Sequence, residues 1–398
     1  MRKSKSIYAI AVLCVLSLAG ILSCQKTEEL EKGMTDAPKI SAQKVSVTAA
    51  AAGAFVHPGI LNTQESLDIA GNEANNNNQS RVAAYQYVLN YCNQHSPSNA
   101  YKANVGVAGG TITQDESNFK GDALLAYALA LRWAKTGTAS YATTARQILN
   151  GWATAFRTLV VTGGSESNQP ALEASWAAPT FAAAAEILKY YVPANGQNGG
   201  WTSANNTQFV TFLNRLKTQY IDKVAGIGHQ NNWDISAGYA KMAIGIFEDN
   251  QTIYQDGMNQ IKTMLPIVIK ADGSLPNEIC GYHNDCVHFQ YALTGFSYAA
   301  NLGAIQGDAS IYTASNSRLH EGYKFQYRFY NKQLNPALCV SCSTGSMIWP
   351  GIEIANRRYN STETNFIHGK YNPSTDGLPN GDLSFLCWTN YTHNNVFP

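Results

Sequence analysis

Residues 145–156 read Ala-Arg-Gln-Ile-Leu-Asn-Gly-Trp-Ala-Thr-Ala-Phe, and the spacing within this stretch decides the fold class. Its apolar residues Ala145, Ile148, Trp152 and Phe156 recur at steps of three and four, which places them on one face of an α-helix. Such a helix buries one apolar stripe and needs a neighbouring element to cover it. The stretch therefore predicts a fold in which helices pack on one another.

The same pattern recurs along most of the chain and is bounded by Gly, Asn, Asp or Pro. It predicts helices over residues 123–133, 141–156, 179–191, 206–220, 234–247, 253–269, 288–302 and 310–329. Strand signals are limited to residues 105–112 and 346–354, without the alternation of strands and helices that builds a parallel sheet. We predict a mainly α fold, an incomplete α/α toroid of helical hairpins with a few short strands and with loops lining one groove.

The N-terminus has the pattern of an export signal. Three basic residues among the first five precede an apolar run over residues 7–22, which is shorter than the ~20 residues of a membrane-spanning helix. At its end, Ile-Leu-Ser-Cys at residues 21–24 resembles the cleavage site of bacterial lipoproteins, in which the cysteine, here Cys24, is lipidated. Residues 25–29 resemble the charged export tag of surface lipoproteins in Bacteroides-like bacteria. A plain signal peptide or a membrane anchor is the alternative.

These features divide the chain into a signal peptide over residues 1–23, a flexible tether over residues 24–53 and a folded domain over residues 54–398. The tether is rich in Lys, Glu, Thr, Ser and Ala and has no aromatic residue, so it cannot build a core. The folded domain is expected to begin near His57. We expect an exported lipoprotein, held to the outer membrane by its lipid anchor, at the cell surface or in the periplasm.

The composition limits the partners of the chain. With 45% hydrophobic and 14% charged residues, the 398-residue chain is globular. Loss of residues 1–23 removes three of the 28 basic residues and none of the 27 acidic ones, which leaves a formal net charge of −2. This balance gives no indication of a nucleic-acid partner. An acidic polymer would have to be held by a local group of donors.

Beyond the signal, the chain has the cysteines Cys92, Cys280, Cys286, Cys339, Cys342 and Cys387. Six are too few for a disulfide framework in a long exported chain. Cys339 and Cys342 have the spacing of a metal or redox site, but no second pair accompanies them. We expect a buried thiol pair or a local disulfide there. No ligand cluster in the sequence requires a metal or another cofactor.

Residues 278–290, Glu-Ile-Cys-Gly-Tyr-His-Asn-Asp-Cys-Val-His-Phe-Gln, gather the side chains of proton-transfer chemistry. They include Tyr282, His283 and His288 together with two carboxylates, directly before a helical pattern. A second polar cluster, His-Gln-Asn-Asn-Trp-Asp at residues 229–234, also opens into a helical pattern. We expect the two helix starts to converge on one site.

Short motifs occur in order at residues 57–61, 122–127, 148–153, 181–188, 231–234, 285–290 and 350–355, from His-Pro-Gly-Ile-Leu at the first to Pro-Gly-Ile-Glu-Ile-Ala at the last. Through these motifs, which cover most of the folded domain, the chain resembles the alginate-lyase-like polysaccharide lyases with an α/α toroid. Asn284 stands where such lyases often carry Arg, and Trp233 stands where better-known members carry His. His288 lies near the place of their catalytic Tyr.

The resemblance implies β-elimination on alginate or a related polyuronate, in which the proton at C5 is removed and the glycosidic oxygen at C4 leaves. Preorganised donors must neutralise the neighbouring carboxylate, a role for the amides of Asn232 and Gln290. His288 is the leading base, because an imidazole titrates near ~6.5. Tyr282 or His283 is the acid or the second base.

The remaining substrate-binding candidates are Asn231, Trp233, His229, Arg358 and Trp176. Arg358 would bind a neighbouring uronate by bidentate hydrogen bonds, and the two tryptophans would stack on sugar rings. Each candidate has a structural alternative: a buried or solvated histidine, an asparagine helix cap, a solvated arginine or a core tryptophan.

Two other functions remain open at this point. A toroid glycoside hydrolase would use Glu278 or Asp285 with Asp234 as a carboxylate pair. A glycan-binding lipoprotein without catalysis is compatible with Asn284 and Trp233. The products separate the three, because a lyase leaves an unsaturated uronate, a hydrolase leaves a saturated reducing end, and a binding protein leaves no product.

Overall fold

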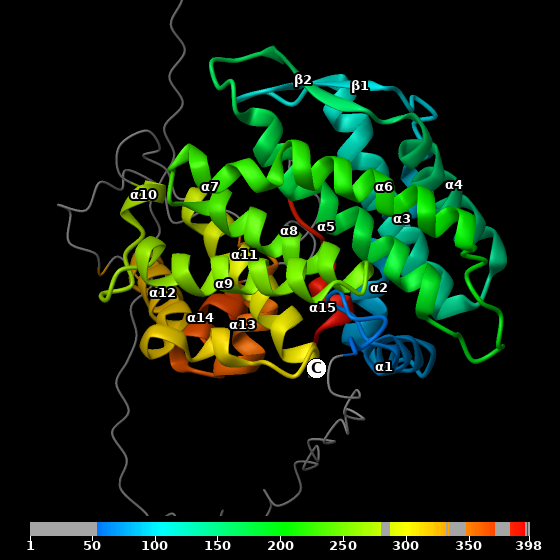
Figure 1. The fold of residues 1–398 in the computed structure, drawn as a ribbon. Coiled ribbons are helices and arrows are strands. Elements are labelled where there is room, and N and C mark those ends of the chain that lie inside the picture. The colour runs from blue at the N-terminus through cyan, green and yellow to red at the C-terminus, as the bar shows by residue number, and fades with distance from the viewer. Residues whose placement is uncertain are drawn as a thin grey trace, which may run out of the picture. The chain divides into compact units, whose positions relative to one another are not determined.

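The computed structural model describes residues 54–279, 287–331, 333, 348–370, 383–394 and 396, which all belong to one folded unit, Val45–Pro398. Its elements, labelled in Figure 1 where there is room, are α1 (Gln64–Asn75), α2 (Gln79–Gln94), β1 (Asn104–Ala108), α3 (Gln114–Thr136), α4 (Ala139–Ala155), β2 (Thr158–Gly163), α5 (Gln169–Tyr190), α6 (Ser203–Gln219), η1 (Ile221–Lys223), α7 (Val224–Ile227), α8 (Asn232–Phe247), α9 (Gln251–Val268), α10 (Pro276–Ile279), α11 (His288–Ile305), η2 (Ser310–Tyr312), α12 (Ala314–Tyr330), α13 (Gly351–Tyr359), α14 (Thr362–Lys370) and α15 (Thr389–Thr392).

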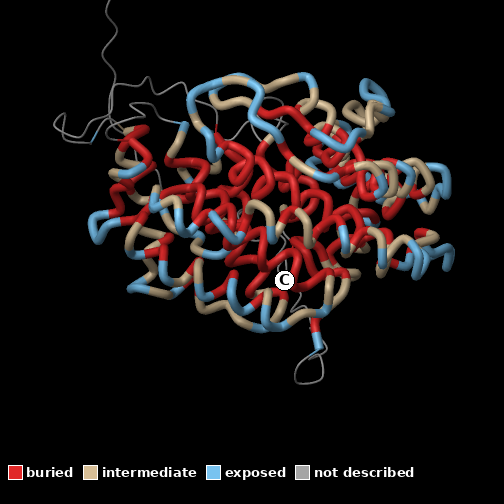
Figure 2. The backbone as a smooth tube through the Cα atoms, turned by 45° about the horizontal axis from the view of Figure 1, so that its top comes forward, coloured by how far each residue is buried: buried red, intermediate tan, exposed pale blue. Residues whose placement is uncertain are grey.

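The long helices form two layers of hairpins. The inner layer holds α3, α5, α8 and α11, which pack on one another in this order, and each is followed in the chain by an outer helix, α4, α6, α9 or α12. α5, α8 and α11 are buried at nearly every position, whereas α4 and α9 bury only one stripe. Figure 2 shows the same division, with buried positions along the interior helices and exposed positions on the connections. The predicted mainly α fold of helical hairpins is confirmed.

The contact between α8 and α9 depends on a glycine. A Cβ added at Gly257 of α9 would lie 2.5 Å from the backbone oxygen of Gly238 in α8. That separation is well inside van der Waals contact, so no larger residue fits without moving the helices apart. The contact fixes α8, whose first turn carries several of the candidate site residues.

Several helices begin earlier than their apolar pattern indicates. α3 starts at Gln114, where the Thr113 hydroxyl accepts from Glu116 N and the Glu116 carboxylate accepts from Thr113 N. The predicted start at residue 123 is therefore too late. α1 and α2 were not predicted, because both are rich in Asn and Gln and α2 buries only three residues.

β1 and β2 form a two-stranded parallel sheet in which Val105 pairs with Leu159. The predicted strand over residues 105–112 is confirmed in its first part as β1, whereas β2 was not predicted. The predicted strand over residues 346–354 is wrong from Gly351 onward, where α13 begins. Every residue from Gly351 to Ala355 is buried, so the alternating apolar residues there do not mark a strand with one exposed face.

Within the described ranges, no helix is long and apolar enough to cross a membrane, and no group of three or more His, Cys, Asp or Glu side chains is placed to hold a metal ion. Cys92 and Cys387 are free thiols. The predicted Cys339–Cys342 pair and the predicted lipidation site Cys24 lie outside the described residues.

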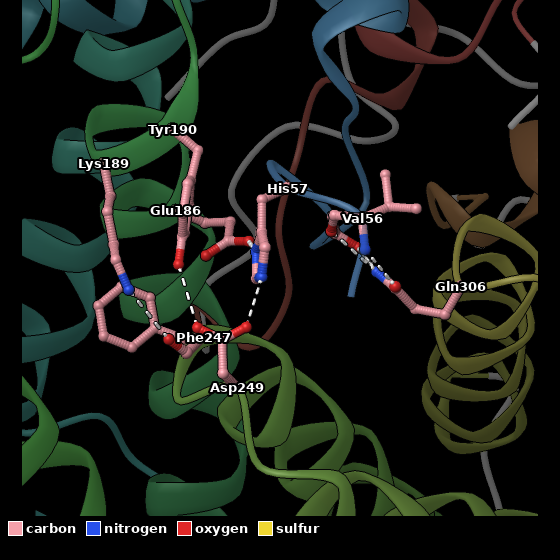
Figure 3. A network of polar contacts seen from close by, with 9 residues as sticks. Val56, His57, Glu186, Lys189, Tyr190, Phe247, Asp249 and Gln306 are labelled. Atoms are coloured by element: carbon pink, nitrogen blue, oxygen red, sulfur yellow. Dashed lines mark hydrogen bonds and ion pairs between the residues drawn. The ribbon is translucent and has the colours of Figure 1, made fainter. Parts of the chain in front are cut away.

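The first described residues are held to two inner helices by His57. Its Nδ1 lies 2.5 Å from Glu186 Oε1 in the last turn of α5, and its Nε2 lies 2.8 Å from Asp249 Oδ1 just after α8 (Figure 3). The imidazole also stacks on Tyr190, with ring centroids 4.1 Å apart. Burial lowers the pKa of His57, but hydrogen bonds and charges from Glu186 and Asp249 outweigh burial and raise the pKa above its usual value. His57, Glu186 and Asp249 are called the His57 clamp below.

Next to the clamp, a side chain that follows α11 holds the backbone of Val56. Val56 N donates to Gln306 Oε1 at 2.8 Å, and Gln306 Nε2 donates to Val56 O at 3.2 Å (Figure 3). The first described residues thus join the ends of α5, α8 and α11, three of the four inner helices.

Candidate active site

The turn before α8 is built from polar residues that fold onto the helix start. Gln230 has a left-handed φ of 50°, and the N-cap Asn231 accepts a hydrogen bond from Trp233 N through Oδ1 at 3.1 Å. The structural alternative for Asn231, a helix cap, is therefore confirmed. Its role in substrate binding stays a prediction.

Asn232, the first residue of α8, is buried beside a carboxylate. Its Nδ2 donates to Glu278 Oε2 in α10 at 2.9 Å, and Glu278 is completely buried. A second bond, from Asn277 Nδ2 to Gln230 O at 2.9 Å, ties α10 to the turn before α8. Because an amide nitrogen carries two N–H groups, Asn232 can be held by Glu278 through one and offer the other to an anion.

Trp233 and His229 lie next to each other at this turn. Their rings meet edge to face with centroids 4.6 Å apart. His229 Nε2 lies 4.0 Å from Glu166 Oε2 in the connection between β2 and α5, and both side chains are about one-third exposed, at 35% and 34%. Trp233 itself is 9% exposed, so most of its surface packs against protein.

The second predicted helix start, at His288, carries an aromatic cluster. The half-buried imidazole of His288 begins α11, and its ring centroid lies 5.4 Å from that of Tyr291 one turn later. Tyr291 stacks on Trp176 of α5 at 5.3 Å with an interplanar angle of 18°, and it meets Trp349 edge to face at 4.2 Å. The four rings form one continuous group.

The two helix starts are joined through α5. Trp176 Nε1 donates to Ser236 Oγ of α8 at 3.1 Å while its ring stacks on Tyr291 of α11. α8 and α11 also approach closely, because a Cβ added at Gly295 would lie 2.9 Å from Ile235 Cγ2. Figure 1 shows α5, α8 and α11 side by side. The expectation that the two polar segments meet is confirmed for α8 and the described part of the second segment.

Of the other candidates, Gln290 has structural contacts, Arg358 lies elsewhere, and two cannot be placed. Gln290 Oε1 accepts from Gln326 Nε2 at 3.2 Å and from Trp349 N at 3.1 Å, so its carbonyl holds the fold together. The Arg358 guanidinium lies 5.0 Å from the Tyr312 ring, which follows the far end of α11 from His288. The structure therefore does not bring Arg358 to the two helix starts. Tyr282 and His283 lie outside the described residues, as do Asn284 and Asp285.

Trp176 was a candidate for stacking on a sugar, with a core position as the alternative. It is 6% exposed and packed between α3, α8 and α11. The free protein thus gives its ring the surroundings of a core residue. Its place beside Tyr291 still makes it part of the site.

A buried ionic cluster lies behind Trp176. Lys120 Nζ lies 2.7 Å from Glu116 Oε1 and 2.5 Å from Glu173 Oε2, and all three side chains are at most 3% exposed. Glu173 Oε1 also accepts from Gln169 Nε2 at 2.6 Å. Burial, opposed by the charge of Lys120, raises the pKa of Glu173 to about 7. Glu116, Lys120 and Glu173 are called the Lys120 cluster below.

Sequence reasoning missed Tyr291 and the Lys120 cluster. Tyr291 could have been found, because residues three apart share a face of a helix that begins at His288. The four-residue spacing of Glu116 and Lys120 is also a helical ion-pair spacing, but the predicted helix began after both. Nothing in the sequence pairs Lys120 with Glu173, which lies 53 residues away.

Asp234 lies in the first turn of α8 and is 3% exposed. Burial raises its pKa, although the backbone amides of Asn231 and Gln230 donate to the carboxylate and oppose the shift. The carboxylate pair of the hydrolase alternative would thus consist of a buried Asp234 and a Glu278 bonded to Asn232.

The described residues include the kinds of side chain that proton transfer next to an anion requires. Asn232 provides a buried donor, His288 provides a half-buried imidazole, and Tyr291 provides a phenol beside it. A buried donor interacts strongly with a charged group because little water competes with it.

The chain matches known proteins in sequence and in fold. A comparison with solved structures finds alginate lyase A1-III from Sphingomonas species A1, with 19% identity, 76% of this chain and 86% of that chain covered, and a TM-score of 0.57. It also finds an alginate lyase from Bacteroides ovatus, with 13% identity, 79% and 96% covered, and a TM-score of 0.60. At these identities the likeness concerns the fold, which is the expected toroid.

A variant of alginate lyase A1-III with a Tyr→Phe substitution, complexed with a tetrasaccharide, matches with 17% identity, 76% and 86% covered, and a TM-score of 0.56. A comparison with curated proteins gives no match. The family model described as alginate lyase matches residues 67–335. This match spans more than half of the chain, and the chain therefore belongs to the alginate lyase family, a family of polysaccharide lyases.

Proposed function

We propose that the chain cleaves alginate or a related polyuronate, such as glucuronan, by β-elimination. The proposal rests above all on the meeting of two helix starts, which places Asn232, joined to Glu278, in the same group of packed helices as His288 and Tyr291. In a member of the alginate lyase family, these side chains match the tasks of neutralising a carboxylate, removing a proton and protonating a leaving oxygen.

The reaction assigns one task to each side chain. Asn232 donates to the uronate carboxylate, so that negative charge can develop at C5. His288 takes the C5 proton, the C5–H electrons form the C4=C5 double bond, and the C4–O bond breaks. Tyr291 gives its proton to the departing oxygen, with Tyr282 or His283 as the acid suggested by the sequence alone. Asn231, Trp233 and His229 line the substrate beside Asn232.

The tetrasaccharide held by the A1-III variant supports a substrate of oligosaccharide size or longer. The proposed substrate is accordingly an acidic polysaccharide rather than a single sugar. No cofactor is needed for this reaction, because both proton transfers are made by side chains.

The test follows near-ultraviolet absorbance from new unsaturated ends. The mature protein is incubated separately with polymannuronate, polyguluronate, glucuronan and chondroitin. We expect the wild type to act on at least one polyuronate and His288→Ala to lower kcat by ~100-fold or more, since a general base contributes 10²–10⁴-fold. The control is His320→Ala, because His320 of α12 stacks on Tyr359 at 4.4 Å, away from both helix starts.

The other outcomes identify the alternatives. Saturated reducing ends without absorbance would indicate a hydrolase, and Asp234→Asn should then remove them. Binding of a polyuronate without any product would indicate a glycan-binding protein. Full activity in His288→Ala would leave the lyase in place and assign the base elsewhere.

We also propose that the chain is an exported lipoprotein, anchored in the outer membrane at Cys24. The support is the basic and apolar pattern of residues 1–22 and the Ile-Leu-Ser-Cys sequence that ends at Cys24. Metabolic labelling with a fatty acid should mark the wild type, and Cys24→Ser should abolish the label. A labelled Cys24→Ser variant would contradict the anchor.

A further inference from the structure

The Lys120 cluster is buried in the protein next to the Trp176 ring of the candidate site. Lys120 Nζ contacts both carboxylates and also lies 5.1 Å from the centroid of the Trp176 ring, within the range of a cation–π interaction. The ammonium group therefore has three neighbours that fix its place. Since Lys120 is 1% exposed and Glu173 is 2% exposed, a polymer in solution cannot reach the cluster directly.

Trp176 connects this cluster to the residues that face the reaction. Its indole N–H donates to Ser236, its ring lies against the Lys120 ammonium, and its ring also stacks on Tyr291. The three contacts come from α8, α3 and α11. Trp176 thus helps to set the place of the Tyr291 ring, which lies next to the His288 ring and also packs on Trp349.

Stability does not account for the cluster. Ionisable groups lose their hydration when they are buried, and apolar or neutral replacements of buried ion pairs are often as stable as the charged original. The cluster also holds two carboxylates for one ammonium group. An arrangement of this kind next to a reaction site is expected where geometry matters more than stability.

We propose that the Lys120 cluster is a positioning device of the lyase: it fixes Trp176, and Trp176 in turn fixes Tyr291 for proton transfer. Lys120 and Glu173 are positioning residues, because neither touches the substrate. The inference deepens the proposed function and rests on it.

The main test neutralises the whole cluster in the triple variant Glu116→Gln, Lys120→Met and Glu173→Gln. The amide introduced at position 116 would still accept from Thr113 N, and the amide introduced at position 173 would still accept from Gln169, so the local hydrogen bonds are kept. We expect the triple variant to fold, to lower kcat by ~10-fold or more, and to change KM by less than ~3-fold, because small misplacements of reacting groups act on the chemical step. The single variant Lys120→Arg, which keeps the positive charge, should have a kcat between those of the triple variant and the wild type.

The matched control is Lys262→Met, which removes the 3.0 Å ion pair with Asp308 after the far end of α11 from His288. It should leave kcat and KM at wild-type values. A folded triple variant with wild-type kcat would overturn the proposal, as would a loss confined to KM.

A second measurement separates this inference from the proposed function. The difference between the near-ultraviolet circular dichroism spectra of the wild type and Trp176→Phe reports on the packing of Trp176 against Tyr291. The same difference is measured between the triple variant with and without Trp176→Phe. It should be much smaller there than in the wild type, whether or not the wild type cuts any polyuronate. An inactive wild type would therefore refute the lyase, whereas an unchanged difference spectrum in the triple variant would refute the positioning.

Discussion

The His57 clamp and the Lys120 cluster have the same combination of charged groups but differ in their exposure to solvent. Each places a basic side chain between two carboxylates from different parts of the chain. The Lys120 cluster is buried throughout, whereas the clamp is buried at Glu186 and opens to solvent at Asp249, which is 58% exposed. The same combination therefore has different electrostatic consequences at the two places.

The difference lies in the titration of the basic group. Burial lowers the pKa of Lys120, but Glu173 and Glu116 outweigh burial and raise it above the 10.5 of an ordinary lysine. The ammonium group therefore stays charged near neutral pH. Burial lowers the pKa of His57, but Glu186 and Asp249 outweigh burial and raise it above the 6.5 of an ordinary histidine. In the Lys120 cluster the basic group keeps its charge near neutral pH, whereas the charge of the imidazole in the clamp depends on pH.

The largest expected effect is the loss of protein stability when the Lys120 cluster loses its cation. Lys120→Met alone leaves two buried carboxylates without their cation, and we expect it to lower the free energy of unfolding by about 3–5 kcal/mol. The neutral triple variant should lose far less, because no unpaired charge remains. Urea unfolding followed by fluorescence measures both. Equal losses in the two variants would show that the charges themselves do not govern stability here.

A smaller loss is expected when His57 is removed from the clamp. His57→Ala leaves the buried Glu186 without its imidazole partner, and we expect a loss of about 1–3 kcal/mol in the free energy of unfolding. Asp249→Asn should change stability by only about 0–1 kcal/mol, because this carboxylate is largely solvated. Equal losses of unfolding free energy in His57→Ala and Asp249→Asn would show that the burial of Glu186 does not determine the contribution of the clamp.

The smallest expected effect is the pH dependence of the clamp. The pKa of His57 is higher in the folded state than the 6.5 of an ordinary histidine, so folding favours the protonated ring. Its contribution to stability is fully present below pH 6.5 and is lost as the pH rises through the raised folded pKa. The difference in unfolding free energy between the wild type and His57→Gln should therefore shrink as the pH rises above 6.5.

The same difference is measured for Lys262→Met as a control, since Lys262 pairs with Asp308 and has no part in the clamp. A difference between the wild type and His57→Gln that stays constant, or grows as the pH rises, would rule out the protonated clamp.

Periodicity in the sequence predicted what depends on local pattern. The apolar stripe of α4, with Ala145, Ile148 and Trp152, was found because an amphipathic helix shows its buried face in its spacing. α5, α8 and α11 were found as helices, but their burial on all sides was not, since it depends on which helices surround them. β2 was missed, because a strand paired with only one neighbour and exposed at Val160 and Val161 has little pattern of its own.

The candidate site was also predicted only in part, because only its local features are visible in the sequence. Asn232 and His288 were found because polar residues at helix starts are visible in sequence. The contacts around them were not found, because Glu278 reaches Asn232, and Trp176 reaches Ser236 and Tyr291, through the tertiary fold. Nothing in the sequence separates Arg358 from the other candidates. In the structure Arg358 lies near Tyr312, at the other end of α11 from His288.

The bonds between Val56 and Gln306 have a consequence for the order of folding. During synthesis the partners of this segment appear one after another, with Glu186 before Asp249 and Gln306 last. The backbone of Val56 can therefore find both of its hydrogen bonds only after residue 306 has been made. Closure of the N-terminal segment onto the inner helices is thus a late step, and a chain that ends before residue 306 would keep this segment open to proteases and chaperones.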